Sequence, residues 1–240
     1  MKISKTTLNL LSSFVKLNPS ILIKKGSRIT TTNVGKENNR LIPIKSVLVS
    51  VDVIEEFQND FAIYDLKQFL DVIDAFNEPD FLFNDTFVEI KENNHSIKYA
   101  FVNPKVVLVP NTDSLILEKD KEFFLLDPKT LATLKKMSIV LKHDDLFIRN
   151  AKDKKSIELV LTTVTDGSDE HFNEFVVSID KEVESEFNIQ LSMKNIGLVI
   201  IDKNVYNARI SPYGGKDILV LEGTSDTKII YYFTGKRNKP

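Results

Sequence analysis

The chain contains no cysteine and no tryptophan, and only eight of its 240 residues are glycine. Without thiols it cannot form disulfides, thiolate zinc sites, iron–sulfur clusters or a cysteine nucleophile. So low a number of glycines is also unusual for an enzyme that holds nucleotide phosphates in a glycine-rich loop. The longest apolar runs, such as residues 106–109 and 198–201, fall far short of the roughly 18 residues of a membrane span. The first residues lack the apolar core and cleavage site of a signal peptide, so we expect a soluble intracellular protein.

Charge is the most uneven property of the chain, although the net charge is only −2. Residues 1–45 carry nine basic side chains and one acidic side chain, whereas residues 46–112 carry four and twelve. The same change from positive to negative occurs again, with a net charge of +5 in residues 128–155 and −8 in residues 156–190. This alternation indicates either one positive and one negative face or ordinary solvated surface.

The first third of the sequence predicts a helix followed by a hairpin. Ser4 is a typical N-cap, and the helix is expected to end near Asn18-Pro19. Its predicted buried stripe consists of Leu8, Leu11, Phe14 and Val15, and its exposed face of Lys5, Asn9, Ser12 and Lys16. Residues 21–23 and 28–30 are predicted to pair as a hairpin through the turn at residues 24–26.

A second helix is expected over residues 65–76, with Asp65 as its cap. Its predicted buried stripe is Leu66, Phe69, Leu70, Ile73 and Phe76. Short strands are expected at residues 81–83, 87–90 and 97–101.

The pattern then starts again, which indicates an internal duplication of about 115–125 residues. Asp127-Pro128 predicts a helix start, with Leu131, Leu134 and Met137 or Ser138 facing inward. Residues 139–141 and 146–149 are predicted to form a hairpin, and a short fourth helix is expected after Ser192. Strands are expected at residues 205–211, 217–222 and 228–233. The sequence therefore predicts an α+β protein of two similar domains, residues 1–111 and 123–240, joined by a connector at 112–122, each with two helices on antiparallel sheet.

No catalytic or metal-binding motif is found. The histidines His95, His143 and His171 lie in polar, turn-like segments without metal-ligand spacing. Gly214-Gly215 is expected to be a turn between strands, because the phosphate-loop pattern is absent. Adjacent acids, Glu55-Glu56 and Asp144-Asp145, should point to opposite faces of an extended chain. The acidic stretch between residues 166 and 186 is interpreted as a solvated flank. We expect no catalytic residue, no metal and no cofactor.

The predicted exposed helix faces carry lysines, with almost no arginines or aromatic residues beside them. Lysine is a flexible point charge, whereas arginine reads base edges and aromatic side chains stack on single-stranded bases. Such faces suit non-specific attraction to duplex phosphates. Asp71 and Asp74 share a helix face with Lys67 and make it locally acidic, so ordinary solvated surface remains an alternative. The candidate DNA-binding residues are Lys5, Lys16, Lys67, Lys129, Lys135, Lys136 and Lys194.

Several segments resemble a known family. The opening residues 1–29 (MKISKTTLNLLSSFVKLNPSILIKKGSRI) and residues 61–73 (FAIYDLKQFLDVI) are similar to the sliding clamps of T4-type bacteriophages, the processivity factors of phage DNA polymerases. Residues 106–111 (VVLVPN) resemble the end of the first clamp domain. Residues 204–211 (NVYNARIS), 217–222 and 228–233 resemble the closing strands of clamps.

The resemblance implies a DNA-clamp fold and a homotrimeric ring around double-stranded DNA. It also implies tethering of the DNA polymerase, loading by an ATP-driven clamp loader, and action in the cytoplasm of an infected bacterium. Clamps receive partner peptides near the interdomain connector, and the matching residues here are Leu108, Val109, Pro110 and Ile116. Two other hypotheses stay open: a phage assembly or structural protein that self-associates through sheet edges, and a hydrolase with an unrecognised carboxylate site.

Overall fold

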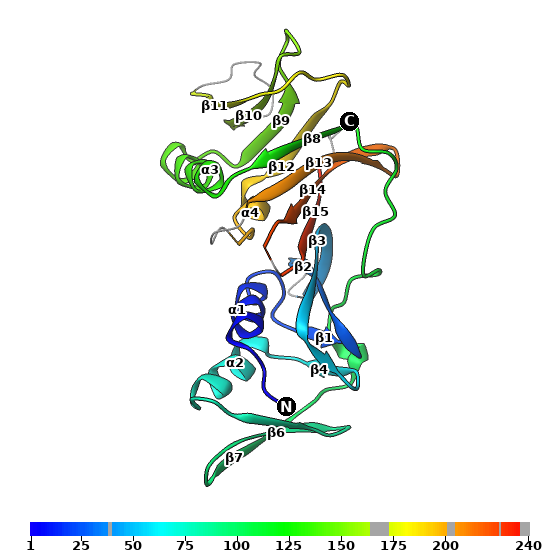
Figure 1. The fold of residues 1–240 in the computed structure, drawn as a ribbon, viewed down its shortest axis with the longest axis vertical. Coiled ribbons are helices and arrows are strands. Elements are labelled where there is room, and N and C mark those ends of the chain that lie inside the picture. The colour runs from blue at the N-terminus through cyan, green and yellow to red at the C-terminus, as the bar shows by residue number, and fades with distance from the viewer. Residues whose placement is uncertain (38–39, 164–172, 201–204, 226, 236–240) are drawn as a thin grey trace. The chain divides into compact units, whose positions relative to one another are not determined.

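The computed structural model describes residues 1–37, 40–163, 173–200, 205–225 and 227–235 (Figure 1). The chain forms two compact units, Met1–Asp113 and Ser114–Pro240. The division falls inside residues 112–122, where the connector was expected, and the role of that segment as a connector stays a prediction.

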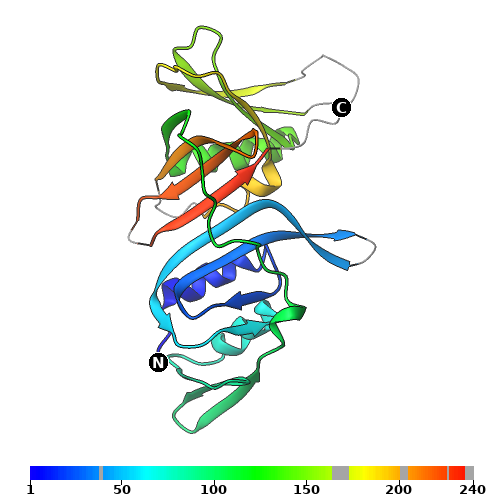
Figure 2. The ribbon, with the colours of Figure 1, turned by 90° about the vertical axis from the view of Figure 1, so that its right-hand side faces the viewer.

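The N-terminal unit contains two helices and three strand groups. Its elements are α1 (Lys5–Phe14), β1 (Ile21–Ile23), β2 (Gly26–Glu37), β3 (Arg40–Phe57), β4 (Phe61–Ile63), α2 (Leu66–Asp74), β5 (Asp80–Phe83), β6 (Phe87–Glu92), β7 (His95–Ala100) and the 3₁₀ turn η1 (Pro104–Val106). The strands pair antiparallel as β1 with β4, β2 with β3, and β5-β6-β7 in order. Figure 2 shows α1 and α2 on one side of the long β2–β3 hairpin.

The C-terminal unit repeats this arrangement. Its elements are β8 (Glu122–Leu126), α3 (Pro128–Leu141), β9 (Asp145–Asn150), β10 (Ser156–Thr162), β11 (Phe175–Asp180), β12 (Asn188–Ser192), α4 (Met193–Ile196), β13 (Tyr206–Tyr213), β14 (Lys216–Gly223) and β15 (Ile229–Thr234). Within this unit the strands form the antiparallel orders β11-β10-β9-β12 and β8-β13-β14-β15.

The duplication expected from the sequence is visible in the pairing. In each unit the strand after the first helix pairs with the strand before the second, β1 with β4 and β9 with β12. Three consecutive strands then close the unit, β5 to β7 and β13 to β15. The strand after the second helix also bonds to the residues before the first helix in both units. In the C-terminal unit β13 pairs with β8. In the N-terminal unit the Phe81 amide of β5 donates to the Met1 carbonyl at 2.8 Å.

Three helix starts agree with the sequence. Ser4 accepts a hydrogen bond from the Thr7 amide at 3.2 Å. Asp65 accepts one from the Gln68 amide at 2.9 Å, and Asp127 accepts one from the Thr130 amide at 2.9 Å. These hydrogen bonds satisfy amides that have no partner within the helix. The bonds from Thr130 hold the pKa of Asp127 below its ordinary value. Ser192 precedes α4 as expected, but its side chain makes no cap hydrogen bond.

The first helix differs from the prediction in two respects. It ends at Phe14 rather than near Asn18, because the amides of Lys16 and Leu17 bond to carbonyls three residues back and tighten the chain into a turn. The buried face is also rotated. Leu11 and Phe14 are buried as expected, but Thr7 and Leu10 are buried while Leu8 and Val15 are half-buried.

Both predicted hairpins are wrong. Residues 21–23 pair with residues 61–63, and residues 28–30 belong to β2, which pairs with β3. Residues 139–141 are the last turn of α3, which ends where Lys142 adopts a left-handed conformation (φ 55°) and the His143 amide bonds to Ser138. The partner of β9 is therefore β10 on one side and β12 on the other.

The later strands and turns agree with the sequence. Residues 81–83, 87–90 and 97–100 lie in β5, β6 and β7, and the three C-terminal strands lie at β13, β14 and β15. Gly214 and Gly215 form the turn between β13 and β14, with φ angles of 58° and 76° that suit glycine. Glu55 is buried and Glu56 exposed, as alternation in a strand requires.

A buried carboxylate fixes the start of α1 to β3. Glu55 is 6% exposed, and its two oxygens accept hydrogen bonds from the Ser4 amide (2.5 Å) and the Thr7 hydroxyl (2.6 Å). Burial alone would raise the pKa of Glu55, but the hydrogen bonds from Thr7 and Ser4 outweigh burial and keep its pKa below the ordinary value. The ionised form therefore stabilises the folded unit.

We expect the Glu55→Gln variant to lose about 1–3 kcal/mol of unfolding free energy at pH 7, since the amide has one acceptor oxygen where the carboxylate has two. The wild-type contribution is present above the unfolded-state pKa of a glutamate and is lost as pH falls through the lower folded-state pKa. Urea unfolding at several pH values measures both effects.

The matched control for this variant is Glu56→Gln, which replaces the exposed neighbour and should change stability by less than about 0.5 kcal/mol. Equal losses in the two variants would show that Glu55 does not hold the helix.

Candidate nucleic-acid interface

The polar face of α1 is exposed as the sequence predicted. Lys5, Asn9 and Ser12 are exposed along the side of α1 opposite its buried residues, and Lys16 is exposed in the turn that follows the helix. Among the described residues, neither Lys5 nor Lys16 has an ion-pair or hydrogen-bond partner for its ammonium group. The face is therefore a row of polar groups with two available positive charges and no acid.

The second helix is electrostatically different. Lys67 is exposed, but its ammonium group lies 2.5 Å from Asp71, one helical turn away. The hydrogen bond and the charge of Asp71 raise the pKa of Lys67 above its ordinary value. Asp71 and Asp74 are both exposed. Lys67 is thus a member of a neutral pair on a face of net negative charge.

The charged faces of α1 and α2 meet in one open groove of about 670 Å³. Lys5, Asn9 and Ser12 line it from α1, and Asp71 and Asp74 line it from α2. Leu8, Leu70, Ile73 and Phe81 also line this groove. A polyanion that approaches Lys5 therefore also meets the carboxylates of α2, which weakens the attraction on this side of the unit.

In the C-terminal unit the candidate lysines fall into two groups. Lys129 and Lys136 on α3 and Lys194 on α4 are exposed, and α3 is in contact with α4. Lys135 is half-buried and donates to the carbonyl of Val199 at 2.6 Å. Its ammonium group therefore holds the chain after α4 in place, in contrast to the solvent-facing charge expected from the sequence.

Exposed apolar residues end the same helix. Ile139 is 77% exposed and Val140 is 61% exposed, directly after the lysines of α3. Residues 139–141 were predicted to form a strand, and β-branched side chains such as Ile139 and Val140 favour strands chiefly where a sheet partner is present.

The candidate partner-binding residues lie in the segment that leaves the N-terminal unit. Leu108, Val109 and Pro110 are half-buried, and Ile116 is 93% exposed. The backbone of Leu108 is held at both ends, since its carbonyl accepts from the Asn18 side chain at 2.7 Å and its amide donates to the Ser20 hydroxyl at 3.3 Å. The role of these four residues stays a prediction.

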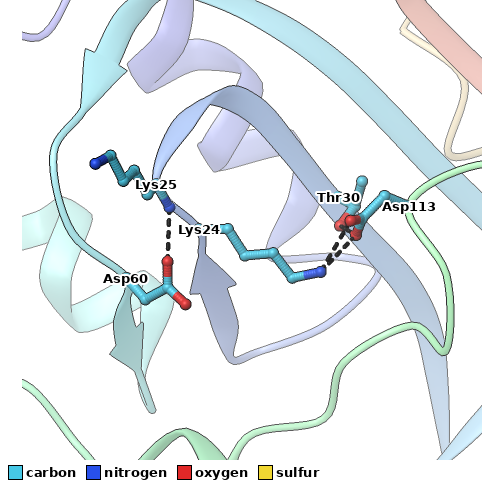
Figure 3. A network of polar contacts seen from close by, with 5 residues as sticks. All are labelled: Lys24, Lys25, Thr30, Asp60 and Asp113. Carbon is cyan, nitrogen blue, oxygen red and sulfur yellow. Dashed lines mark hydrogen bonds and ion pairs between the residues drawn. The ribbon is translucent and has the colours of Figure 1, made fainter.

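Sequence reasoning missed a polar network at the end of this segment (Figure 3). Both carboxylate oxygens of Asp113 lie 2.9 Å from the Lys24 ammonium, and the Thr30 hydroxyl donates to one of them at 3.1 Å. The hydrogen bond from Lys24 is the main reason that the pKa of Asp113 lies below its ordinary value. The opposite charges were visible in the sequence, but a separation of 89 positions gives no local signal.

One histidine is buried, although the sequence indicated a polar, turn-like segment at the surface or in a hairpin. His143 is buried because it follows directly on the left-handed end of α3, which turns its ring inward. The ring nitrogens contact the Thr163 hydroxyl (3.0 Å) and the Asn173 carbonyl. His95 is exposed as expected. His171 and residues 166–172 of the acidic stretch lie outside the described residues.

The described residues contain no group of three or more histidine or carboxylate side chains that could hold a metal ion. Glu55 is a buried carboxylate with a shifted pKa, but its oxygens are occupied as a helix cap. No helix among the described residues is long and apolar enough to cross a membrane.

The fold is that of the DNA clamps. The chain superposes on proliferating cellular nuclear antigen (PCNA) from Entamoeba histolytica with a TM-score of 0.65 at 12% identity, covering 96% of this chain and 95% of that one. A PCNA from A. fulgidus, solved with the C-terminal region of FEN-1 bound, gives 0.64 at 12% identity, with 97% and 96% covered. The Helicobacter pylori beta clamp gives 0.63 at 13% identity, covering 100% of this chain and 66% of that one.

Sequence comparison identifies the type of clamp. The chain is 28% identical to the sliding clamp of Vibrio phage KVP40 over 218 residues, covering 89% of this chain and 92% of that protein. It is 23% identical to the sliding clamp of Escherichia phage RB69, with 82% of each covered. No family model matches the chain. The resemblance to the sliding clamps of T4-type phages is confirmed, and the function of the chain is that of a sliding clamp, a processivity factor for DNA polymerase.

The pairing of Lys67 with Asp71 leads to a test of which lysines meet DNA. The Lys67→Gln/Asp71→Asn double variant removes the pair without changing the net charge. We expect its salt-dependent retention on DNA to stay within about twofold of wild type, because the salt dependence counts phosphates neutralised by available cations.

The comparison variant is Lys5→Gln/Lys16→Gln, which removes two available charges and should lower retention at every salt concentration. A larger loss in the Lys67/Asp71 variant than in this one would mean that Lys67 leaves Asp71 to contact phosphate.

Proposed function

We propose that the chain assembles as a homotrimeric ring that encircles duplex DNA and tethers the replicative polymerase of a phage. An ATP-driven loader opens and closes the ring, and the ring acts in the cytoplasm of the infected bacterium. The chain has no catalytic activity of its own. The observation that carries the proposal is the set of exposed lysines at the first helix of each repeated unit: Lys5 on α1, Lys16 in the turn after it, and Lys129 and Lys136 on α3.

A ring that encloses DNA stays on it without strong attraction between the protein and the phosphates. Each phosphate neutralised by a bound cation makes binding steeper in salt and slows movement along the duplex. The exposed residues Lys5, Lys16, Lys129, Lys136 and Lys194 provide a weak positive lining, and the acids of α2 dilute it. Among the candidate lysines, Lys67 and Lys135 are the least suited to contact phosphate, because their ammonium groups have partners within the chain.

Two sheet edges suit head-to-tail assembly. In the described residues β7 and β11 each have a strand neighbour on one side only. Ile97 on β7 is 40% exposed and Val176 on β11 is 43% exposed. Pairing of β7 of one copy with β11 of the next uses different surfaces on each protomer, which closes into a ring when the rotation per copy divides a full turn. Partner peptides bind at Leu108, Val109 and Pro110, just before the connector, and at Ile116 within it.

The lysine assignment is tested by replacing Lys5, Lys16, Lys129 and Lys136 with glutamine. With loader present, retention on circular DNA at moderate salt should fall about tenfold or more, and polymerase processivity should shorten. Circular dichroism should show an intact fold, since all four side chains are exposed.

A control of equal charge replaces the exposed residues Lys105, Lys119, Lys152 and Lys216 with glutamine. Full processivity in the first variant, or an equal loss in both, would refute the lysine assignment. Equal wild-type retention on linear and circular DNA would refute encirclement itself.

The ring interface is tested by Ile97→Lys, which places a charge on the proposed contact edge. We expect the trimer to dissociate to monomers at micromolar concentration in sedimentation, because an unpaired charge buried in an interface is costly. Leu82→Lys is the control, since Leu82 is 42% exposed on β5 at the other edge of the same sheet. A wild-type dimer, or a trimer that persists in the Ile97 variant, would contradict this interface.

A further inference from the structure

The segment that leaves the N-terminal unit is held at two points with a short span between them. At the first point the backbone of Leu108 bonds to the side chains of Asn18 and Ser20. At the second point the Asp113 carboxylate receives the Lys24 ammonium and the Thr30 hydroxyl. The residues between are 109–112, which include the half-buried Val109 and Pro110.

The first anchor is built into the core. Asn18 is 1% exposed and Ser20 is 6% exposed, and the Asn18 side-chain oxygen accepts from both the amide and the hydroxyl of Ser20. The loop that carries them is itself fixed, because the Leu17 carbonyl accepts from Val34 of β2 and the Pro19 carbonyl accepts from Leu66 of α2. The position of Leu108 is therefore set by the same contacts that join α1 to the rest of the unit.

The second anchor is of a different kind. The side chains of Lys24 and Asp113 are 49% and 42% exposed, so their attraction is open to screening by salt. Lys24 lies between β1 and β2, and its neighbour Lys25 is held through its backbone amide to Asp60 at 2.7 Å (Figure 3). The fixed backbone of this turn aims the Lys24 side chain at Asp113.

We propose that Lys24 and Asp113 are positioning residues that hold residues 109–112 in the conformation that a partner peptide binds. The inference rests on the proposed function, in which this segment receives the polymerase. A segment that is already ordered loses less conformational entropy when a partner docks on it. The anchor at Leu108 rests on the buried side chains of Asn18 and Ser20, whereas the ion pair at Asp113 is exposed and restrains the far end of the segment.

The experiment compares Lys24→Met, Asp113→Asn and the double variant with wild type, and uses Lys25→Met as the matched control. Hydrogen exchange of residues 109–113 should speed up in the first three proteins and stay unchanged in the control. Affinity for the purified polymerase encoded by the same phage should fall about two- to fivefold, the range of an exposed ion pair. The double variant should lose no more than either single variant.

Salt concentration gives an independent readout. Raising the salt concentration from 50 to 500 mM should move wild-type exchange toward that of the variants, with little change in the variants themselves. Ser20→Ala tests the core anchor, and should speed exchange at Leu108 as well.

Unchanged exchange in the Lys24 and Asp113 variants would overturn the anchor. Faster exchange with unchanged polymerase affinity would overturn the positioning role. Wild-type protein that binds no polymerase would instead refute the proposed function, and the exchange data would still report on the anchor.

Discussion

The antiparallel pairing of the strand after one helix with the strand before the next determines the arrangement of each unit. Ile21–Ile23 pairs with Phe61–Ile63, and Asp145–Asn150 pairs with Asn188–Ser192. Because α1 leads into β1 and α2 follows β4, this pairing brings the two helices side by side, and the same holds for α3 and α4. The polar faces of the helices can act together only because these short strands meet.

The helix faces carry only a moderate positive charge. The available cations are lysines, whose flexible ammonium groups attract phosphate without fixing it. Asp71 neutralises Lys67, and Lys135 is used to hold the Val199 carbonyl. In the proposed ring, enclosure of the DNA would make tight contacts unnecessary, and the moderate charge is compatible with that proposal.

Local signals in the sequence predicted local structure well. Asp65 and Asp127 are caps as expected, and the strands from β5 to β7 and from β13 to β15 lie where alternation placed them. The errors concern the choice of partner. Residues 21–23 find their partner about forty residues away, and neither the turn at Gly26 nor the strand pattern encodes that distance.

In the candidate site, too, local features followed from the sequence, whereas contacts between distant residues did not. Exposure of the α1 face and the closeness of Asp71 to Lys67 followed from helical spacing, but the partner of Lys135 did not. A pair four residues apart is visible in the sequence, whereas Lys135 and Val199 are joined only by the packing of the unit. Asp113 and Lys24 likewise become neighbours only after folding.

The carboxylate of Glu55 beneath the first turn of α1 has one more consequence. It joins the beginning of the chain to a strand some fifty residues later. Fraying of the amino-terminal turn is therefore coupled to opening of β3, so the helix and the strand behave as one cooperative foldon. The helix, which is synthesised before β3, therefore gains its full order only after β3 has emerged.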